Sequence, residues 1–369
     1  MFEYFPNNYP WSLAVMGALS RGGQISEIDD ACRPLREIAA KKNDPAAQMA
    51  WFESWMKLAE RVERLGDADE LALHPLSAGR KFMRAGLYYL MAERMPSHKD
   101  PRRMIAYKRG IALYARGLKL RCEPVEVIEI PYGEHRLKAY FVKAPGSGRA
   151  PCVVHFDGFD VTKEIIHGGV ADEYRRRGIS LLIVDHPGVG EALRLDHLPA
   201  IPETEKPAGA AVDYLETRAD VDPKRIGIVA LSLGGYYAPR AAAFEPRASA
   251  CIALGGPYDW AAAWDGLPAL TREAFRVRSH CATAQEARRH AGTLSLVGVA
   301  HRINCPIYIM NGRQDRIVPS QDAERLAREV AGPVTLHIIE DGNHVATNRA
   351  YRWRSQSADW MAEQLRCVE

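Results

Sequence analysis

Residues 226–235 of this chain, Ile-Gly-Ile-Val-Ala-Leu-Ser-Leu-Gly-Gly, decide its fold. The apolar, β-branched start of this stretch predicts a buried strand, and the residues from Tyr236 onward predict a helix. Ser232 stands in the turn between them, where small neighbours such as Ala230 and Gly234 let the strand and the helix approach closely. Such a turn lifts a serine side chain above the edge of a parallel sheet. A plain strand–helix loop that contains a serine is the alternative interpretation.

Strand and helix patterns alternate on both sides of this turn. Strands are predicted at residues 125–131, 136–143, 151–156, 179–184, 225–231, 248–254, 306–310 and 334–339. Helices are predicted at residues 163–177, 208–218, 236–244, 320–330 and 348–365. An opening hairpin followed by repeated β–α units predicts the α/β class, with an eight-stranded, mostly parallel sheet covered by helices on both faces. Together with the serine turn, this is the pattern of the α/β-hydrolase fold.

The first third of the chain has a purely helical pattern. Apolar residues recur at helical spacing in three stripes, one containing Trp51 and Trp55, a second Phe82, and a third running from Ile105 to Leu118. Glycines within these stretches indicate close helix contacts or helix ends. We therefore predict an N-terminal helical cap domain over residues 1–123, followed by a catalytic sheet domain over residues 124–369.

A gap interrupts the sheet pattern after the sixth predicted strand. Residues 257–304 have no strand signal, but they contain Trp260, Trp264 and Phe275. An insertion at this point follows the carboxyl end of a strand, which is where ligands bind in open α/β sheets. We expect this insertion to form a second lid element.

The charge balance excludes several functional classes. The 49 basic residues oppose 46 acidic ones, which leaves a formal net charge of only +3. There is thus no electrostatic basis for binding a nucleic acid or an anionic membrane, and a small-molecule substrate is the expected partner. No phosphate-binding loop, dinucleotide fingerprint or HExxH motif is present, so we expect neither a cofactor nor a metal. Whether the chain forms a homodimer stays open at this stage.

The cysteines and the N-terminus bear on the cellular compartment. The seven cysteines are odd in number and none forms a CxxC pair, which favours free thiols in a reducing compartment over disulfides or a zinc site. The start of the chain, Met1-Phe2-Glu3-Tyr4, lacks the basic region of a targeting signal. We expect a cytoplasmic protein.

Two later loops offer partners for Ser232. Asp315 follows the strand that ends at Met310, and His344 follows the last strand. Both loops therefore lie at the carboxyl edge of the sheet, in the acid-before-histidine order expected after a serine nucleophile. We predict a triad with Ser232 as nucleophile, His344 as general base and Asp315 as the orienting acid. Asp259 and Asp341 are the competing acids.

The loop after the third strand is the candidate oxyanion site. Two backbone N–H groups are needed there, and Leu233, the residue after the nucleophile, is expected to supply one. Gly158 permits a sharp turn in the other loop, so Phe159 is the candidate second donor, with a simple β-turn as the alternative. Asp160 beside it would contact the substrate or cap the following helix. The Asp185–Glu191 loop is interpreted as structural, with His186 as a candidate pocket residue.

Several of these segments together resemble one branch of the α/β-hydrolases. The resemblance rests on Gly158-Phe159-Asp160-Val161-Thr162-Lys163-Glu164, on the Asp185–Glu191 loop and on the predicted triad. The branch contains 2,6-dihydroxypseudooxynicotine hydrolase and the fungal yellowish-green polyketide-shortening hydrolases. Its members have a helical N-terminal domain, and the resemblance implies that an acidic side chain, here Asp160, handles the substrate. Ala230 departs from the usual first glycine of the serine motif.

The resemblance also implies an activity. It implies hydrolysis of a C–C bond next to a ketone, through an acyl-enzyme on Ser232, in a bulky ketone-bearing, aromatic or polyketide-like substrate. An esterase, a thioesterase or an acyl-transferring cyclase would use the same triad, because the pocket selects the leaving group. A non-catalytic binding protein on this fold is a further alternative, against which the joint presence of three triad residues argues.

The predicted cap offers aromatic candidates for the pocket. Tyr88, Tyr89, Tyr107 and Tyr114 are candidates to contact the substrate. Aromatic residues at helical spacing are more often plain core, which is the alternative for each of them.

Overall fold

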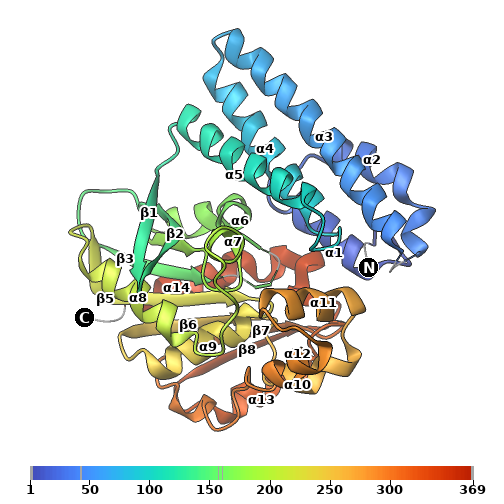
Figure 1. Ribbon diagram of the computed structural model, residues 1–369. Coiled ribbons are helices and arrows are strands. Elements are labelled where there is room, and N and C mark those ends of the chain that lie inside the picture. Colours follow the sequence, from blue (N-terminus) through green and yellow to red (C-terminus); the bar gives the residue numbers. More distant parts are fainter. Residues whose placement is uncertain (1–2, 42–43, 157, 160, 367–369) are drawn as a thin grey trace. The chain divides into compact units, whose positions relative to one another are not determined.

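The computed structural model (Figure 1) describes residues 3–41, 44–156, 158–159 and 161–366. The chain divides into two compact units, Met1–Val125 and Glu126–Glu369. From the sequence we placed this boundary after residue 123. Within the described residues, no helix is both long and apolar enough to cross a lipid bilayer. That the helical unit caps the site concerns the relative placement of the two units and stays a prediction.

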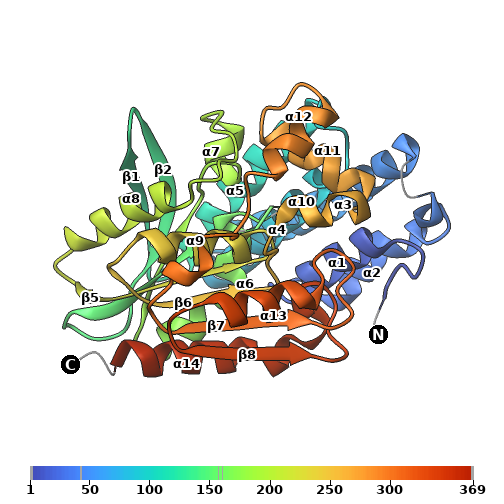
Figure 2. The ribbon, with the colours of Figure 1, turned by 90° about the horizontal axis from the view of Figure 1, so that it is seen from below.

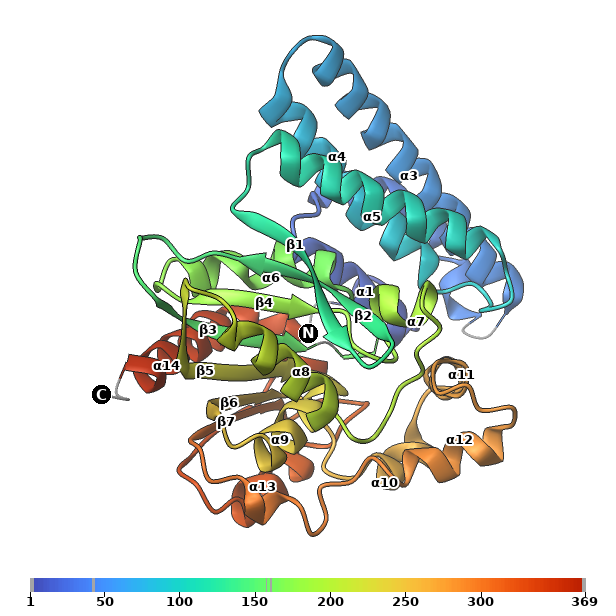
Figure 3. The same cartoon turned by 60° about the vertical axis from the view of Figure 1, so that its left-hand side comes forward.

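The first unit is built from helices. Its α-helices are α1 (Tyr9–Leu19), α2 (Ile25–Cys32), α3 (Pro45–Leu71), α4 (Pro75–Glu93) and α5 (Arg102–Leu120). Helix α4 packs between α3 and α5, and the three run side by side in Figures 1 and 3. The predicted stripe on α3 is buried, with Trp51 and Trp55 both fully covered. Burial of side chains of this size contributes about 1.5–3 kcal/mol each.

The stripe predicted on α5 is partly wrong. Ile105 is 64% exposed, whereas Tyr107 and Tyr114 are buried. The reason is the close approach of α4 and α5, which occurs where glycines face each other. A Cβ atom added to Gly86 would lie only 2.7 Å from the carbonyl oxygen of Gly110. The contact face of α5 is therefore set by small residues and tyrosines, and Ile105 lies off it.

The second unit contains the predicted α/β sheet. Its strands within the described residues are β1 (Val125–Tyr132), β2 (His135–Val142), β3 (Ala150–Phe156), β4 (Ser180–Val184), β5 (Val221–Leu231), β6 (Ala248–Leu254), β7 (Ile307–Gly312) and β8 (Val334–Ile339). They form one sheet in the order β1-β2-β4-β3-β5-β6-β7-β8. Strand β2 pairs antiparallel with β4, and the pairs from β4–β3 through β7–β8 are parallel. The predicted fold class is confirmed.

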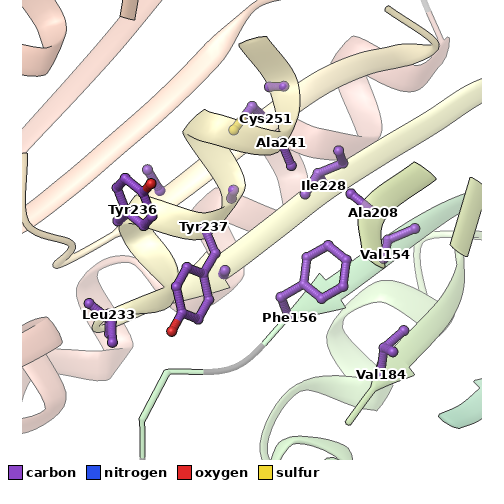
Figure 4. Close-up of a cluster of buried hydrophobic side chains, with 14 of the residues drawn as sticks. Val154, Phe156, Val184, Ala208, Ile228, Leu233, Tyr236, Tyr237, Ala241 and Cys251 are labelled. Atoms are coloured by element: carbon purple, nitrogen blue, oxygen red, sulfur yellow. The ribbon is translucent and has the colours of Figure 1, made fainter. Parts of the chain in front are cut away.

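Helices cover both faces of this sheet. Helices α6 (Lys163–Arg175) and α14 (Arg354–Arg366) pack on one face, and α8 (Glu205–Glu216), α9 (Gly234–Phe244) and α13 (Ser320–Glu329) on the other (Figure 2). The core beneath α8 and α9 contains Val154, Phe156 and Ile228 from adjacent central strands (Figure 4). Because both faces are covered, the central strands contain continuously buried runs, such as residues 226–231 of β5, and not an alternating pattern.

The insertion after β6 forms a group of short helices. These are α10 (Trp260–Ala263), α11 (Ala269–Arg278) and α12 (Ala284–Ala291), and they gather beyond the ends of the strands (Figure 3). Phe275 of α11 is fully buried against Trp260 and Trp264, with ring centroids 6.2 and 5.6 Å apart. The aromatic residues singled out in this segment thus form its own core.

The end of the chain differs from the predicted helix at residues 348–365. A 3₁₀ segment occupies His344–Arg352, and α14 begins only at Arg354. Val345 and Ala346 have φ values of 55° and 43°, which no regular helix contains. The loop that carries His344 therefore uses the residues that sequence periodicity assigns to the start of the helix.

Candidate active site

Ser232 lies in a strained turn between β5 and α9. Strand β5 ends at Leu231 and α9 begins at Gly234, so the serine falls between them. Its φ is +59°, a conformation that costs a non-glycine residue about 1–3 kcal/mol and occurs mostly at functional sites. The turn is held by the Ser232 N–H, which donates to the carbonyl oxygen of Leu254 at 2.8 Å. Its own carbonyl accepts the N–H of Gly235 at 2.7 Å.

His344 and Asp315 meet Ser232 in one hydrogen-bonded chain. Ser232 Oγ lies 2.7 Å from His344 Nε2, and His344 Nδ1 lies 2.8 Å from Asp315 Oδ2. Since the carboxylate can only accept, the imidazole donates through Nδ1–H, which leaves the Nε2 lone pair facing the serine hydroxyl. This is the tautomer that a general base for Ser232 requires.

The Asp315 side chain is fully buried and completely oriented. Its Oδ1 accepts the backbone N–H groups of Ile317 and Val318 at 2.8 and 3.0 Å. Its Oδ2 is then left for the histidine, and the side chain has no solvent exposure. Because each oxygen has a defined partner, the carboxylate is held against rotation.

Both competing acids have other partners. Asp259 caps α10 by accepting the N–H of Ala261 at 3.1 Å. Asp341 pairs with Arg349 at 2.6 Å, and this hydrogen bond lowers the pKa of that carboxyl. Although Asp341 is near His344 in sequence, its side chain is 46% exposed and pairs with Arg349 of the same loop.

The His344 loop is braced by two asparagines. Asn348 Oδ1 accepts the N–H of Asn343 at 2.8 Å, and Asn343 Oδ1 accepts the N–H of Asn348 at 3.2 Å. Asn348 Nδ2 also donates to the carbonyl of Asp341 at 2.8 Å. These bonds stabilise the left-handed residues after His344, and sequence reasoning missed them because the spacing matches no motif.

The loop after β3 lies directly against the serine. A Cβ atom added to Gly158 would lie 2.7 Å from Ser232 Cβ and 2.6 Å from the carbonyl oxygen of Leu231. Only glycine fits so close an approach. Phe159 directly follows this glycine, and Leu233, the residue after Ser232, is the N-cap of α9. That the N–H groups of these two residues are the oxyanion donors stays a prediction.

Phe159 also connects this loop to the insertion. Its ring stacks on Phe275 of α11 at a centroid distance of 5.8 Å and an interplanar angle of 13°. The guanidinium carbon of Arg278 lies 4.6 Å from the centre of the same ring. The sequence identified Phe275 as part of the insertion but not as a neighbour of the predicted oxyanion loop.

The remaining predicted pocket residue of this unit is His186. It is buried, and its ring makes edge contacts with Phe156 and Tyr237 at 5.4 and 5.0 Å. Tyr237 belongs to α9, which follows Ser232, and a contact of His186 with the substrate stays a prediction. Asp160 falls outside the described residues, and its substrate contact stays a prediction.

The predicted pocket tyrosines are buried in the helical unit. Tyr88 donates to Glu27 at 2.7 Å and accepts the N–H of Gln24 at 2.9 Å. Tyr89 donates to Glu63 at 2.7 Å. Tyr107 and Tyr114 are also buried. The hydroxyls of Tyr88 and Tyr89 thus have partners within their own unit, while a contact of any of these rings with substrate stays a prediction.

A buried ionic group beside the Gly158–Phe159 loop was not foreseen. Lys163 lies 2.5–3.0 Å from the carboxylates of Glu164, Asp185 and Glu191. The signal was present, since these residues come from two of the segments on which the family resemblance rests. In the part of the chain that the structure describes, no group of three or more His, Cys, Asp or Glu side chains is arranged to hold a metal ion.

Fold and site together define the class. A mostly parallel eight-stranded sheet with a serine at the β5–α9 turn, joined to a histidine and an aspartate from later strand ends, is an α/β-hydrolase. The chain belongs to the α/β-hydrolase family that contains 2,6-dihydropseudooxynicotine hydrolase, and it is an enzyme of the hydrolase type.

Comparison with known proteins supports this assignment. The 2,6-dihydropseudooxynicotine hydrolase of Paenarthrobacter nicotinovorans is 32% identical over 326 residues, which cover 87% of this chain and 86% of that protein. The crystal structure of 2,6-dihydroxy-pseudo-oxynicotine hydrolase matches with a TM-score of 0.83 and 30% identity over 95% of each chain.

More distant matches agree on the class. The alpha/beta hydrolase xenA of Xenoacremonium sinensis is 28% identical over 273 residues, covering 69% of this chain and 61% of that protein. A model of the prolyl oligopeptidase family matches residues 208–367. That segment begins within α8 and includes Ser232, Asp315 and His344.

Proposed function

We propose that this enzyme is a serine hydrolase that cleaves a C–C bond next to a ketone in a bulky aromatic or polyketide-like small molecule. The hydrogen-bonded chain from Ser232 through His344 to Asp315 is the observation that carries the proposal. A serine hydroxyl is a poor nucleophile unless a base takes its proton, and His344 Nε2 is placed to do so. Asp315 holds the imidazole in the productive tautomer.

The first half of the reaction forms an acyl-enzyme. Ser232 Oγ attacks the ketone carbon while His344 Nε2 takes the hydroxyl proton. The N–H groups of Phe159 and Leu233 stabilise the resulting oxyanion. When the tetrahedral intermediate collapses, the C–C bond breaks and its electron pair leaves on carbon. The protonated His344 then delivers its proton to that carbon.

The second half releases the acid. His344, again neutral, takes a proton from water, and the hydroxide attacks the ester carbonyl on Ser232. Collapse of this second intermediate frees a carboxylic acid and returns the proton to Ser232. The substrate must contain a neighbouring carbonyl or an electron-rich ring, because the departing carbanion needs delocalisation.

The named relatives support this substrate class. One of them acts, by its name, on 2,6-dihydropseudooxynicotine, and the chain matches it over 87% of its own length. The substrate is thus proposed to be an aromatic ketone of this kind.

A fluorophosphonate probe tests the nucleophile. We expect the probe to label Ser232 in the wild type and to leave the Ser232→Ala variant unlabelled, with turnover reduced at least about a thousandfold. Ser249→Ala is the matched control, since that serine lies near the amino end of β6 and its hydroxyl donates to the carbonyl of Lys224 at 2.9 Å. Wild-type turnover in Ser232→Ala would refute the proposal.

Product analysis tests the bond that is cleaved. An aryl β-diketone and an ester with the same acyl group are offered side by side, and the acid product is measured by mass spectrometry. C–C hydrolysis predicts acid from both substrates, dependent on Ser232. Acid from the ester alone would instead favour an esterase or thioesterase, and a cyclised product an acyl-transferring cyclase.

A further inference from the structure

The ionic group at Lys163 is the strongest polar feature outside the triad. The Lys163 side chain is 2% exposed, and those of Glu164 and Asp185 are 1% and 0% exposed. Its Nζ lies 2.7 Å from Glu164, 3.0 Å from Asp185 and 2.5 Å from Glu191. Burying charges is costly unless geometry and hydrogen bonds compensate, so such a group needs a structural or functional reason.

Asp185 links the starts of two helices. Its Oδ1 accepts the backbone N–H of Lys163, the first residue of α6, at 2.9 Å. Its Oδ2 accepts the backbone N–H of Glu191 in α7 (Gly190–Arg194) at 3.0 Å. The residue at the N-cap of α6, Thr162, makes no side-chain cap bond and donates instead to Glu164. Asp185 therefore replaces the local cap from a different element.

Gly190 is what allows this arrangement. Its φ is +49°, and an added Cβ atom would lie 1.9 Å from the carboxyl carbon of Asp185. Any side chain there would displace the carboxylate from both helix starts. The sequence predicts a structural role for the Asp185–Glu191 loop. Its glycine at position 190 leaves the space that the Asp185 carboxylate occupies.

The same group limits the path of the predicted oxyanion loop. At one end, Gly158 is pressed against Ser232. At the other end, Lys163 is bound to Asp185 through both its backbone N–H and its ammonium group. Phe159 lies between these two fixed points, so its backbone position depends on where α6 begins.

We propose that Lys163 and Asp185 are positioning residues for the oxyanion donor at Phe159, acting by fixing the first residue of α6. The inference rests on the proposed serine-hydrolase function. It explains why two of the segments on which the family resemblance rests meet in one buried cluster. Because a displacement of about 1 Å in a catalytic group costs about a hundredfold in rate, the effect is expected in kcat and not in KM.

The first test compares two substitutions, each of which replaces a cationic side chain that bridges carboxylates with methionine. Lys163→Met is expected to lower kcat for an activated ester about a hundredfold, with KM changed less than about threefold. Arg218→Met is the matched control, because Arg218 also bridges two carboxylates, Glu126 and Asp220. It lies just before β5, at the amino ends of the parallel strands and therefore away from the triad. We expect its kcat per folded molecule to equal that of the wild type. Lys163→Arg should recover at least part of the loss.

The second test leaves every charge in place. Gly190→Ala adds a methyl group against Asp185, whereas Gly178→Ala adds one at a similar positive φ of +73° with open space around it. Both variants bear backbone strain, but only Gly190→Ala is expected to lower kcat. This pair keeps the proposal testable if Lys163→Met does not fold.

The outcomes separate this inference from the proposed function. If the fluorophosphonate probe does not label wild-type Ser232, the proposed function fails. If the wild type is labelled but Lys163→Met and Gly190→Ala have wild-type kcat per folded molecule, the positioning role is rejected. Equal losses in Gly190→Ala and Gly178→Ala would also reject it, since backbone strain alone would then explain both.

Discussion

Two buried polar groups of this protein, one from each unit, end in different ways. In the helical unit, Arg103 and Glu93 form a closed pair at 2.7 Å, in which each side chain is a partner of the other. In the sheet unit, Asp315 and His344 form a chain that ends at the hydroxyl of Ser232, which is partly exposed. A closed pair stabilises a fold, whereas a chain with a reactive end can perform chemistry. Burial alone therefore does not identify a site.

Topology explains the difference. Helix α4 packs against both α3 and α5, so their polar side chains meet partners within the same bundle. Parallel strands bring all their carboxyl ends to one edge, so loops distant in sequence converge there. Ser232, Asp315 and His344 all follow strand ends at that edge.

The largest expected effect is at Asp315, the acid of the hydrogen-bonded chain that ends at Ser232. Asp315→Asn replaces the acceptor facing His344 and favours the wrong imidazole tautomer, so kcat should fall about ten-thousandfold. Asp341→Asn, which alters the acid paired with Arg349, should leave kcat within about twofold. Steady-state kinetics on an activated ester measures both. Equal losses in the two variants would remove the distinction between these acids.

A closed pair should affect stability instead. Arg103→Met leaves Glu93 charged and buried, and the free energy of unfolding should fall by about 3–5 kcal/mol. Arg61→Met breaks the exposed pair with Asp30 and should cost about 0–1 kcal/mol. Urea denaturation of the full chain, followed by circular dichroism, gives both values. If the two variants unfold alike, the Arg103 pair is not the stabilising contact that its burial indicates.

The smallest expected effect concerns the predicted pocket tyrosines. Tyr88→Phe removes the hydroxyl that bonds Glu27 and Gln24, which should cost about 1 kcal/mol of unfolding free energy. If Tyr88 is only core, KM and kcat should stay at their wild-type values. A fivefold rise in KM without a change in kcat would instead show that the Tyr88 hydroxyl contributes to substrate binding, and Tyr88 would then not be a purely structural residue.

Much of the sheet unit could be predicted because its signals are local. The apolar strand before Ser232, the glycines after it and the strand-end positions of Asp315 and His344 are all visible in the primary order. Only the start of the helix predicted at residues 348–365 was wrong, since α14 begins at Arg354. The segment before it belongs to the loop that carries His344, which uses left-handed residues at Val345 and Ala346. The periodicity of apolar residues cannot predict these left-handed residues, since they are needed only because His344 must face Ser232, which is far away in the sequence.

The class of fold, the candidate nucleophile and the order of its partners can be inferred from the primary sequence, because neighbouring residues encode strand ends and tight turns. The acid that faces His344, and the contact of Lys163 at the start of α6 with Asp185, follow only from how the chain folds. Those choices depend on hydrogen bonds between side chains far apart in the chain, whose directions are set by packing and not by residue type.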